Sequence, residues 1–134
     1  LLIDKSDSMA DDEKLTKAKK AAYEFAQQML DENGKTRISV VSFNRLASVE
    51  AGFTDISGLT GLLSKINSIT STLKNGGTNI QIALHTAHTL LEASSADIKS
   101  VILLGDGEPT NSQQILSIRN VTATCPAEPH QDPV

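Results

Sequence analysis

Strand-like and helix-like segments alternate along this chain, and their order restricts the fold more than any other property of the sequence. Apolar β-branched runs predict strands, and apolar positions with helical spacing predict helices. This alternation implies a mainly parallel sheet with helices on both faces. We therefore predict a doubly wound α/β fold. The expected elements are a strand ending at residue 3, a helix at 11–33, strands at 37–43 and 47–53, helices at 57–69 and 79–93, and a strand at 101–104.

One pair of strands is expected to be antiparallel. Segments 37–43 and 47–53 are separated by only three residues, which can form a hairpin but not the crossover of about a dozen residues that parallel strands need. The second of these strands should therefore lie at an edge of the sheet. The run at 101–104 is unbroken and apolar, which is typical of a parallel strand covered on both faces.

Polar residues mark the expected ends of the helices. Asp11 lies where the positive end of the first helix favours carboxylates, and Gly34 tolerates a left-handed turn after it. Ser57 is a candidate cap for the second helix, and Leu84 falls on the predicted core side of the third. A run of lysines indicates a solvated face on the first helix. These lysines are Lys14, Lys17, Lys19 and Lys20.

The composition excludes several classes of protein. The 134 residues contain no apolar run long enough to cross a bilayer, so we expect one domain and no membrane insertion. Twelve basic and sixteen acidic residues give a formal net charge of −4, which does not provide the positive field that nucleic acids require. The single cysteine, Cys125, cannot close a disulfide within the chain.

Acidic and hydroxyl residues follow two of the predicted strands. Residues 4–8 are Asp-Lys-Ser-Asp-Ser, and Asp106 follows the apolar run at 101–104. Ligands bind at the carboxyl ends of strands in open α/β sheets, so these side chains would meet if the two strands are neighbours. Alternate residues of an extended or tightly looped chain point the same way, which brings Asp4, Ser6 and Ser8 to one side. Oxygen ligands of this kind suit a hard cation such as Mg²⁺ rather than zinc or copper.

Three segments together resemble a von Willebrand factor type A domain with its metal-ion-dependent adhesion site. They are Asp4-Lys5-Ser6-Asp7-Ser8, Gly76-Gly77-Thr78-Asn79 and Leu104-Gly105-Asp106-Gly107. The resemblance implies that Ser6 and Ser8 bind the metal directly and Thr78 directly or through water, whereas Asp4 and Asp106 act mostly through water. Taken singly, the first segment is also typical of a helix-capping turn, and Thr78 is also a candidate helix cap.

The resemblance implies a non-catalytic module for adhesion or binding. A cation whose direct ligands are neutral hydroxyls keeps part of its charge and attracts a carboxylate from a protein or matrix ligand. The expected ion is Mg²⁺, with Mn²⁺ or Ca²⁺ as alternatives, and the expected location is outside the cell or at its surface. Two alternatives remain open: an intracellular adaptor beside a chaperone-like ATPase, and a metal-assisted hydrolase, for which no general base is predicted near the site.

The chain departs from the family pattern in three places. Asp7 stands where the family very often has Gly, and Asp tolerates a left-handed backbone better than most residues. Gly105 stands where many relatives have Thr. Members of the family continue through two further strands and a helix, whereas this chain predicts a helix at 111–118 and one short strand at 121–125. We expect the domain to occupy 1–125, cut short or interrupted after about 110, with a proline-rich tail at 126–134, in a longer protein.

Overall fold

In the part of the chain that the structure describes, the strands form one four-stranded sheet. The computed structural model describes residues 1–71 and 77–107. The strands are β1 (Leu2–Asp4), β2 (Ile38–Phe43), β3 (Ala47–Thr54) and β4 (Leu103–Leu104). Their order is β3-β2-β1-β4, with β1 parallel to both β2 and β4 and with β3 antiparallel to β2. The structure thus confirms the mainly parallel sheet and the antiparallel strand at its edge.

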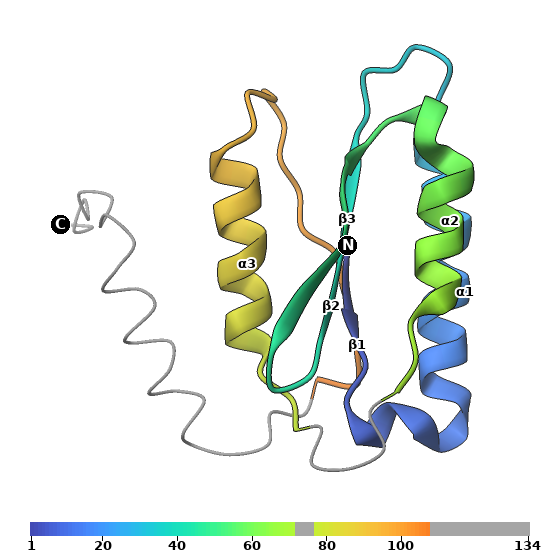
Figure 1. Ribbon diagram of the computed structural model, residues 1–134, viewed down its shortest axis with the longest axis vertical. Coiled ribbons are helices and arrows are strands. Elements are labelled where there is room, and N and C mark those ends of the chain that lie inside the picture. The colour runs from blue at the N-terminus through green and yellow to red at the C-terminus, as the bar shows by residue number, and fades with distance from the viewer. Residues whose placement is uncertain (72–76, 108–134) are drawn as a thin grey trace, which may run out of the picture.

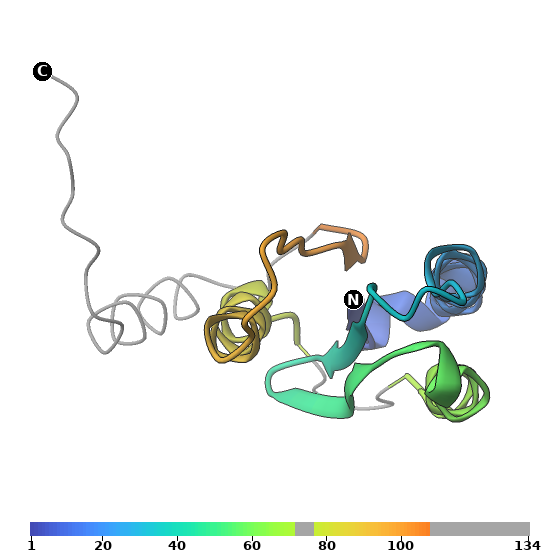
Figure 2. The ribbon, with the colours of Figure 1, turned by 90° about the horizontal axis from the view of Figure 1, so that it is seen from above.

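Helices cover both faces of this sheet, as the doubly wound fold requires. The helices are α1 (Lys14–Met29), α2 (Leu59–Ser68) and α3 (Ile80–Glu92), and two short 3₁₀ segments are η1 (Asp7–Glu13) and η2 (Ile56–Gly58). Helices α1 and α2 lie on one side of the strands and α3 lies on the other (Figures 1 and 2). The predicted fold class is therefore confirmed.

The two faces of the sheet bury different residues because successive side chains of a strand point to opposite sides. Ile3 and Val40 pack towards α1 and α2 in one apolar cluster. Leu2, Val41 and Phe43 pack against α3 in the other. Because both faces are covered, β2 is buried along its whole length. Strand β1 lies between β2 and β4 in the sheet.

The first helix is shorter than the sequence predicts. It begins at Lys14 rather than residue 11, because Asp12 and Glu13 have positive φ angles of 50° and 57°. The preceding 3₁₀ segment η1 places Met9 in the core beside α1, and the chain turns sharply after it. At the other end the helix stops at Met29.

The helix caps also differ in detail from the prediction. Asp55, rather than Ser57, caps the segment before α2, because its Oδ1 accepts a hydrogen bond of 2.9 Å from the Ser57 backbone N–H. Asn79 caps α3 through a 3.1 Å hydrogen bond from the Ile82 N–H to its Oδ1. Leu84 is exposed, because the buried stripe of α3 consists of small alanines at other positions.

Strand β4 is less covered than predicted. It spans two residues, it pairs with β1 alone among the described residues, and its Leu103 is 40% exposed. The predicted helix at 111–118, the strand at 121–125 and the tail at 126–134 lie outside the described residues.

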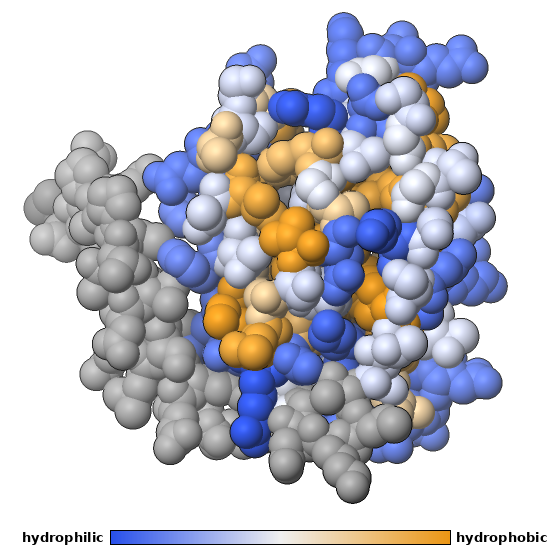
Figure 3. Space-filling view, in the orientation of Figure 1, coloured by the Kyte–Doolittle hydropathy of each residue, from blue (hydrophilic) through white to orange (hydrophobic). Residues whose placement is uncertain are grey.

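Exposed apolar side chains elsewhere form groups separated by polar ones on the face seen in Figure 3. Over residues 1–71 and 77–107, no helix has the length and apolar character needed to span a bilayer.

Candidate functional site

The candidate site lies where β1 and β4 end. These strands are parallel neighbours, with Ile3 paired to Leu104. Asp4 is the last residue of β1, and Asp106 follows β4 by two positions. Parallel pairing therefore brings two carboxylates from distant parts of the chain to one edge of the sheet, as the sequence predicts for neighbouring strands.

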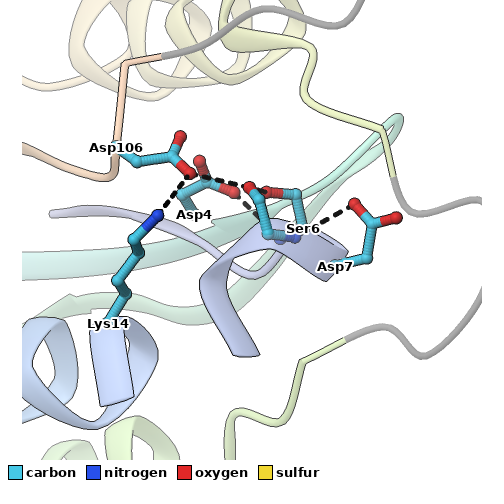
Figure 4. A network of polar contacts seen from close by, with 6 residues as sticks. Asp4, Ser6, Asp7, Lys14 and Asp106 are labelled. Atoms are coloured by element: carbon cyan, nitrogen blue, oxygen red, sulfur yellow. Dashed lines mark hydrogen bonds and ion pairs between the residues drawn. The ribbon is translucent and has the colours of Figure 1, made fainter. Parts of the chain in front are cut away.

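Three polar contacts connect the side chains at this edge (Figure 4). The Ser8 hydroxyl donates a hydrogen bond of 2.7 Å to Oδ2 of Asp106. The Oγ atoms of Ser6 and Ser8 are 3.2 Å apart, and Oδ1 of Asp4 accepts a 2.9 Å hydrogen bond from the Ser6 backbone N–H. We call the side chains of Asp4, Ser6, Ser8 and Asp106 the oxygen cluster. Asp4 and Ser6 are buried, whereas Ser8 and Asp106 are partly exposed. The oxygen cluster is therefore open to solvent on one side.

The local backbone explains how residues 4–8 converge. The Lys5 N–H donates to the Phe43 carbonyl at 2.8 Å, which ties the end of β1 to the end of β2. Ser6 then precedes η1, and its carbonyl accepts a 3.0 Å hydrogen bond from the Met9 N–H. The chain therefore turns tightly enough for the hydroxyls of Ser6 and Ser8 to meet.

Asp7 lies beside the oxygen cluster, at its exposed side. Its Oδ1 accepts a 3.1 Å hydrogen bond from the Ser8 N–H. Asp7 is not among the described residues with positive φ, so its presence in place of the glycine common in the family is not explained by a left-handed backbone. It adds a third carboxylate to this edge.

The surroundings of Asp4 disfavour the charged form of its carboxyl group. Burial raises the pKa of Asp4 above its ordinary value of 3.8, the negative charges of Asp106 and Asp7 raise it further, and hydrogen bonds from Ser6 offset part of this rise. A carboxyl group whose folded pKa is raised destabilises the fold as it ionises with rising pH. A bound cation would remove this cost, so the residues present fit a hard divalent ion.

Hydroxyl groups would have to contribute to a metal site at the oxygen cluster. Within the described ranges, no three side chains of His, Cys, Asp or Glu are arranged to hold a metal ion. A cation at this edge would therefore depend on Ser6 and Ser8 as well as on the carboxylates, which is consistent with a hard ion and not with a thiolate or imidazole site.

Thr78 lies in the loop before α3, which contacts the residue after β2. It is buried, and it precedes Asn79, whose backbone N–H donates a 2.7 Å hydrogen bond to the carbonyl of Asn44. Asn44 directly follows β2, the neighbour of β1. The loop before α3 is thereby held at the carboxyl ends of the strands. Gly76 lies outside the described residues.

Two features of the site have no signal in the sequence. The Lys14 Nζ atom lies 3.7 Å from Oδ2 of Asp106, although the lysine run predicts a solvated helix face. The Lys5 Nζ atom pairs with Oε1 of Glu50 at 3.9 Å, and Glu50 also accepts a hydrogen bond from Ser42. Both pairings depend on the order of the strands, which residue spacing does not reveal.

Gly105 allows Asp4 to occupy its position. A Cβ atom at residue 105 would lie 2.9 Å from Cβ and 3.0 Å from Oδ2 of Asp4. We expect Gly105→Ala to displace this buried side chain, to lower the free energy of unfolding by about 1–3 kcal/mol and to weaken cation binding. Urea unfolding and calorimetric metal titration measure the two effects. Gly52→Ala is the control, because no atom lies within 4 Å of the added Cβ; equal effects of both variants would contradict the prediction.

Fold and site together define a class of protein: a doubly wound α/β domain with an oxygen-lined site at the carboxyl ends of its strands. The family model described as von Willebrand factor type A domain matches residues 1–108. The chain therefore belongs to the von Willebrand factor type A domain family. Among curated proteins, no sequence matches the chain.

Solved structures of two pilus proteins are similar to this domain. The von Willebrand factor domain of the type V pili tip protein Mfa5 from Porphyromonas gingivalis is 30% identical with a TM-score of 0.68, and the match covers 79% of this chain and 36% of that one. The PilB minor pilin from Streptococcus sanguinis is 21% identical with a TM-score of 0.68, covering 79% and 29%. The similarity to this pilin shows the fold alone.

A third similar structure contains a metal. Proximal thread matrix protein 1 from the mussel byssus, with a zinc-occupied MIDAS motif, is 18% identical with a TM-score of 0.62, and the match covers 89% of this chain and 34% of that one. This similarity again shows the fold, and the zinc is a property of the mussel protein. The present chain spans between 29% and 36% of the lengths of the three solved chains.

Proposed function

We propose that this domain is a non-catalytic binding module that holds a divalent cation at the oxygen cluster and uses it to engage a carboxylate of a protein or matrix ligand. The expected ion is Mg²⁺, with Mn²⁺ or Ca²⁺ as alternatives. Its proposed ligands are Ser6 and Ser8 directly, Thr78 directly or through water, and Asp4 and Asp106 mostly through water. The observation that carries the proposal is the 2.7 Å hydrogen bond between Ser8 and Asp106, which are 98 positions apart in the chain.

The chemistry of the cluster supports a carboxylate as the outside ligand. When bound, the cation supplies a Lewis-acid site for one oxygen of the partner. Neutral hydroxyls from Ser6 and Ser8 would leave much of the cation's charge uncompensated, and the carboxylates of Asp4 and Asp106 orient the cluster through hydrogen bonds. Ser8 and Asp106 are partly exposed, so a partner can reach this side of the cluster.

The similar structures support a role at the cell surface or in an extracellular matrix. They come from a pili tip protein, a minor pilin and a byssus thread matrix protein, and none of these names describes an enzyme. We propose the same location, at the cell surface or in an extracellular matrix, for the present chain. An intracellular adaptor would instead be encoded next to a nucleotide-binding domain, so the full-length gene sequence distinguishes these two possibilities.

Titration with metal tests the proposal. We expect Mg²⁺ to bind by isothermal calorimetry and, at 100 times its dissociation constant, to stabilise the domain by about 2.7 kcal/mol, which raises the melting temperature by roughly 8–13 °C relative to EDTA. Titrations with Mn²⁺, Ca²⁺ and Zn²⁺ rank the ions. Absence of heat and of any melting shift with all four ions would refute the proposal.

The carboxylate partner is tested with a small probe. Mn²⁺ bound to the domain enhances the relaxation of water protons, and acetate is expected to reduce this enhancement if its carboxylate replaces a metal-bound water. Chloride at the same ionic strength is the control for screening. An equal response to both anions would argue against a carboxylate ligand while leaving the metal site intact.

A further inference from the structure

Lys14 places a positive charge at the oxygen cluster. It is the first residue of α1, and its Nζ lies 3.7 Å from Oδ2 of Asp106, the same oxygen that accepts the 2.7 Å hydrogen bond from Ser8 (Figure 4). The Lys14 side chain is 38% exposed, whereas that of Asp106 is 11% exposed. The lysine therefore approaches a largely covered carboxylate from solvent and is able to withdraw.

The other lysine near the site is directed elsewhere. Lys5 lies inside the segment that forms the oxygen cluster, but its Nζ pairs with Oε1 of Glu50 at 3.9 Å. Glu50 lies on the edge strand β3 and also accepts a hydrogen bond from the buried Ser42. Lys5 therefore pairs with an acidic residue of β3, and the ammonium group that pairs with Asp106 comes from Lys14, the first residue of α1.

We propose that Lys14 is a tethered counter-cation that competes with the divalent ion for the charge of Asp106 and thereby sets the metal affinity of the site. This inference rests on the proposed function. Without the ion, the ammonium group offsets the repulsion among the three carboxylates of Asp4, Asp7 and Asp106. When the ion binds, two positive charges share one carboxylate and repel each other, so Lys14 must move towards solvent.

The test compares two lysines on the same helix. Lys14→Met removes the charge and keeps an unbranched apolar side chain, and Lys20→Met makes the same change at a lysine that pairs with Glu24 at 3.9 Å, one turn along α1. We expect Mg²⁺ titration by calorimetry to give a dissociation constant roughly 3- to 10-fold lower for Lys14→Met. Lys20→Met should stay within roughly twofold of the wild type, and Lys14→Arg should remain close to it.

Melting in EDTA gives an independent readout. The ion pair with Asp106 is present only when Lys14 keeps its charge, so Lys14→Met should melt below Lys20→Met in EDTA and above it in saturating Mg²⁺. Lys14→Gln provides a second neutral variant if Lys14→Met folds poorly. A competing charge is also screened by salt, so the gain in affinity should shrink at high NaCl.

The outcomes separate this inference from the proposed function. If the wild type binds Mg²⁺ but Lys14→Met and Lys20→Met have the same affinity, the role of Lys14 is refuted and the metal site stands. If the wild type binds no divalent ion, the proposed function fails and the inference fails with it. A tighter Lys14→Met together with the reversed melting order supports the inference.

Discussion

Asp106→Ala is expected to weaken Mg²⁺ binding by roughly 10- to 100-fold. The Asp106 carboxylate accepts the hydrogen bond of Ser8 and contributes a negative charge just after β4. Its loss therefore removes both the orientation of a proposed direct ligand and part of the attraction for the cation. Calorimetric titration with Mg²⁺ measures the change. We expect the metal site rather than the core to be affected, because Asp106 belongs to neither apolar cluster of the core.

Stability in EDTA distinguishes this effect from unfolding. Removing Asp106 also removes one of the charges that raise the pKa of Asp4, which offsets the lost contacts with Ser8 and Lys14. The melting temperature in EDTA should therefore stay within roughly 3 °C of the wild type. Asp97→Ala is the matched control, because Asp97 is an exposed aspartate in the loop after α3. Similar metal affinities for the two variants would exclude Asp106 from the site.

Phe43→Ala is expected to have the largest effect on the fold, lowering the free energy of unfolding by about 3–5 kcal/mol. Phe43 ends β2, is fully buried, and packs with Leu2, Ala83 and Ala87 in the cluster between the sheet and α3. Alanine would leave a cavity between β2 and α3. The alanines of α3 that face it are too small to fill this cavity. Urea unfolding in EDTA measures the loss without a contribution from bound metal.

A second phenylalanine provides the comparison. Phe53 on β3 is only half-buried, and its ring centroid lies 5.6 Å from the guanidinium carbon of Arg37. Phe53→Ala should cost about 1 kcal/mol, since it loses a partly exposed contact. Thr78 lies in the loop directly before α3. The folded fraction of the Phe43→Ala variant should therefore also bind Mg²⁺ more weakly than the wild type. If Phe43→Ala were no more destabilising than Phe53→Ala, the assignment of Phe43 to the core would be wrong.

Local patterns in the sequence were sufficient for the fold class. The alternation of strands and helices predicted the parallel sheet, and the three-residue connection after Phe43 predicted the antiparallel hairpin with β3 at the edge. Periodicity of this kind depends on neighbours within one element, so it can be recognised without the tertiary structure. The predicted start of the first helix at residue 11 and the predicted cap Ser57 of the second helix were wrong. The reason is that the start of a helix depends on how the preceding segment packs.

The candidate site was predicted in part. Asp4, Ser6 and Ser8 are close in sequence, and the position of Asp106 after an apolar run indicated a strand end; the structure brings all four together. Their role as metal ligands, and that of Thr78, stays a prediction. The sequence did not indicate the contact of Lys14 with Asp106. This contact connects the start of α1 with the residues after β4, and it depends on β4 lying beside β1.

The sequence by itself determined the class of fold, the residue types at two strand ends and the resemblance to a family, since these depend on spacing over a few residues. The tertiary structure alone decided that β4 lies beside β1, that a Cβ at residue 105 would meet Asp4, and that Lys14 faces Asp106 while Lys5 faces Glu50. The physical reason is that these contacts join residues far apart in the chain, and the packing of whole helices and strands sets such distances.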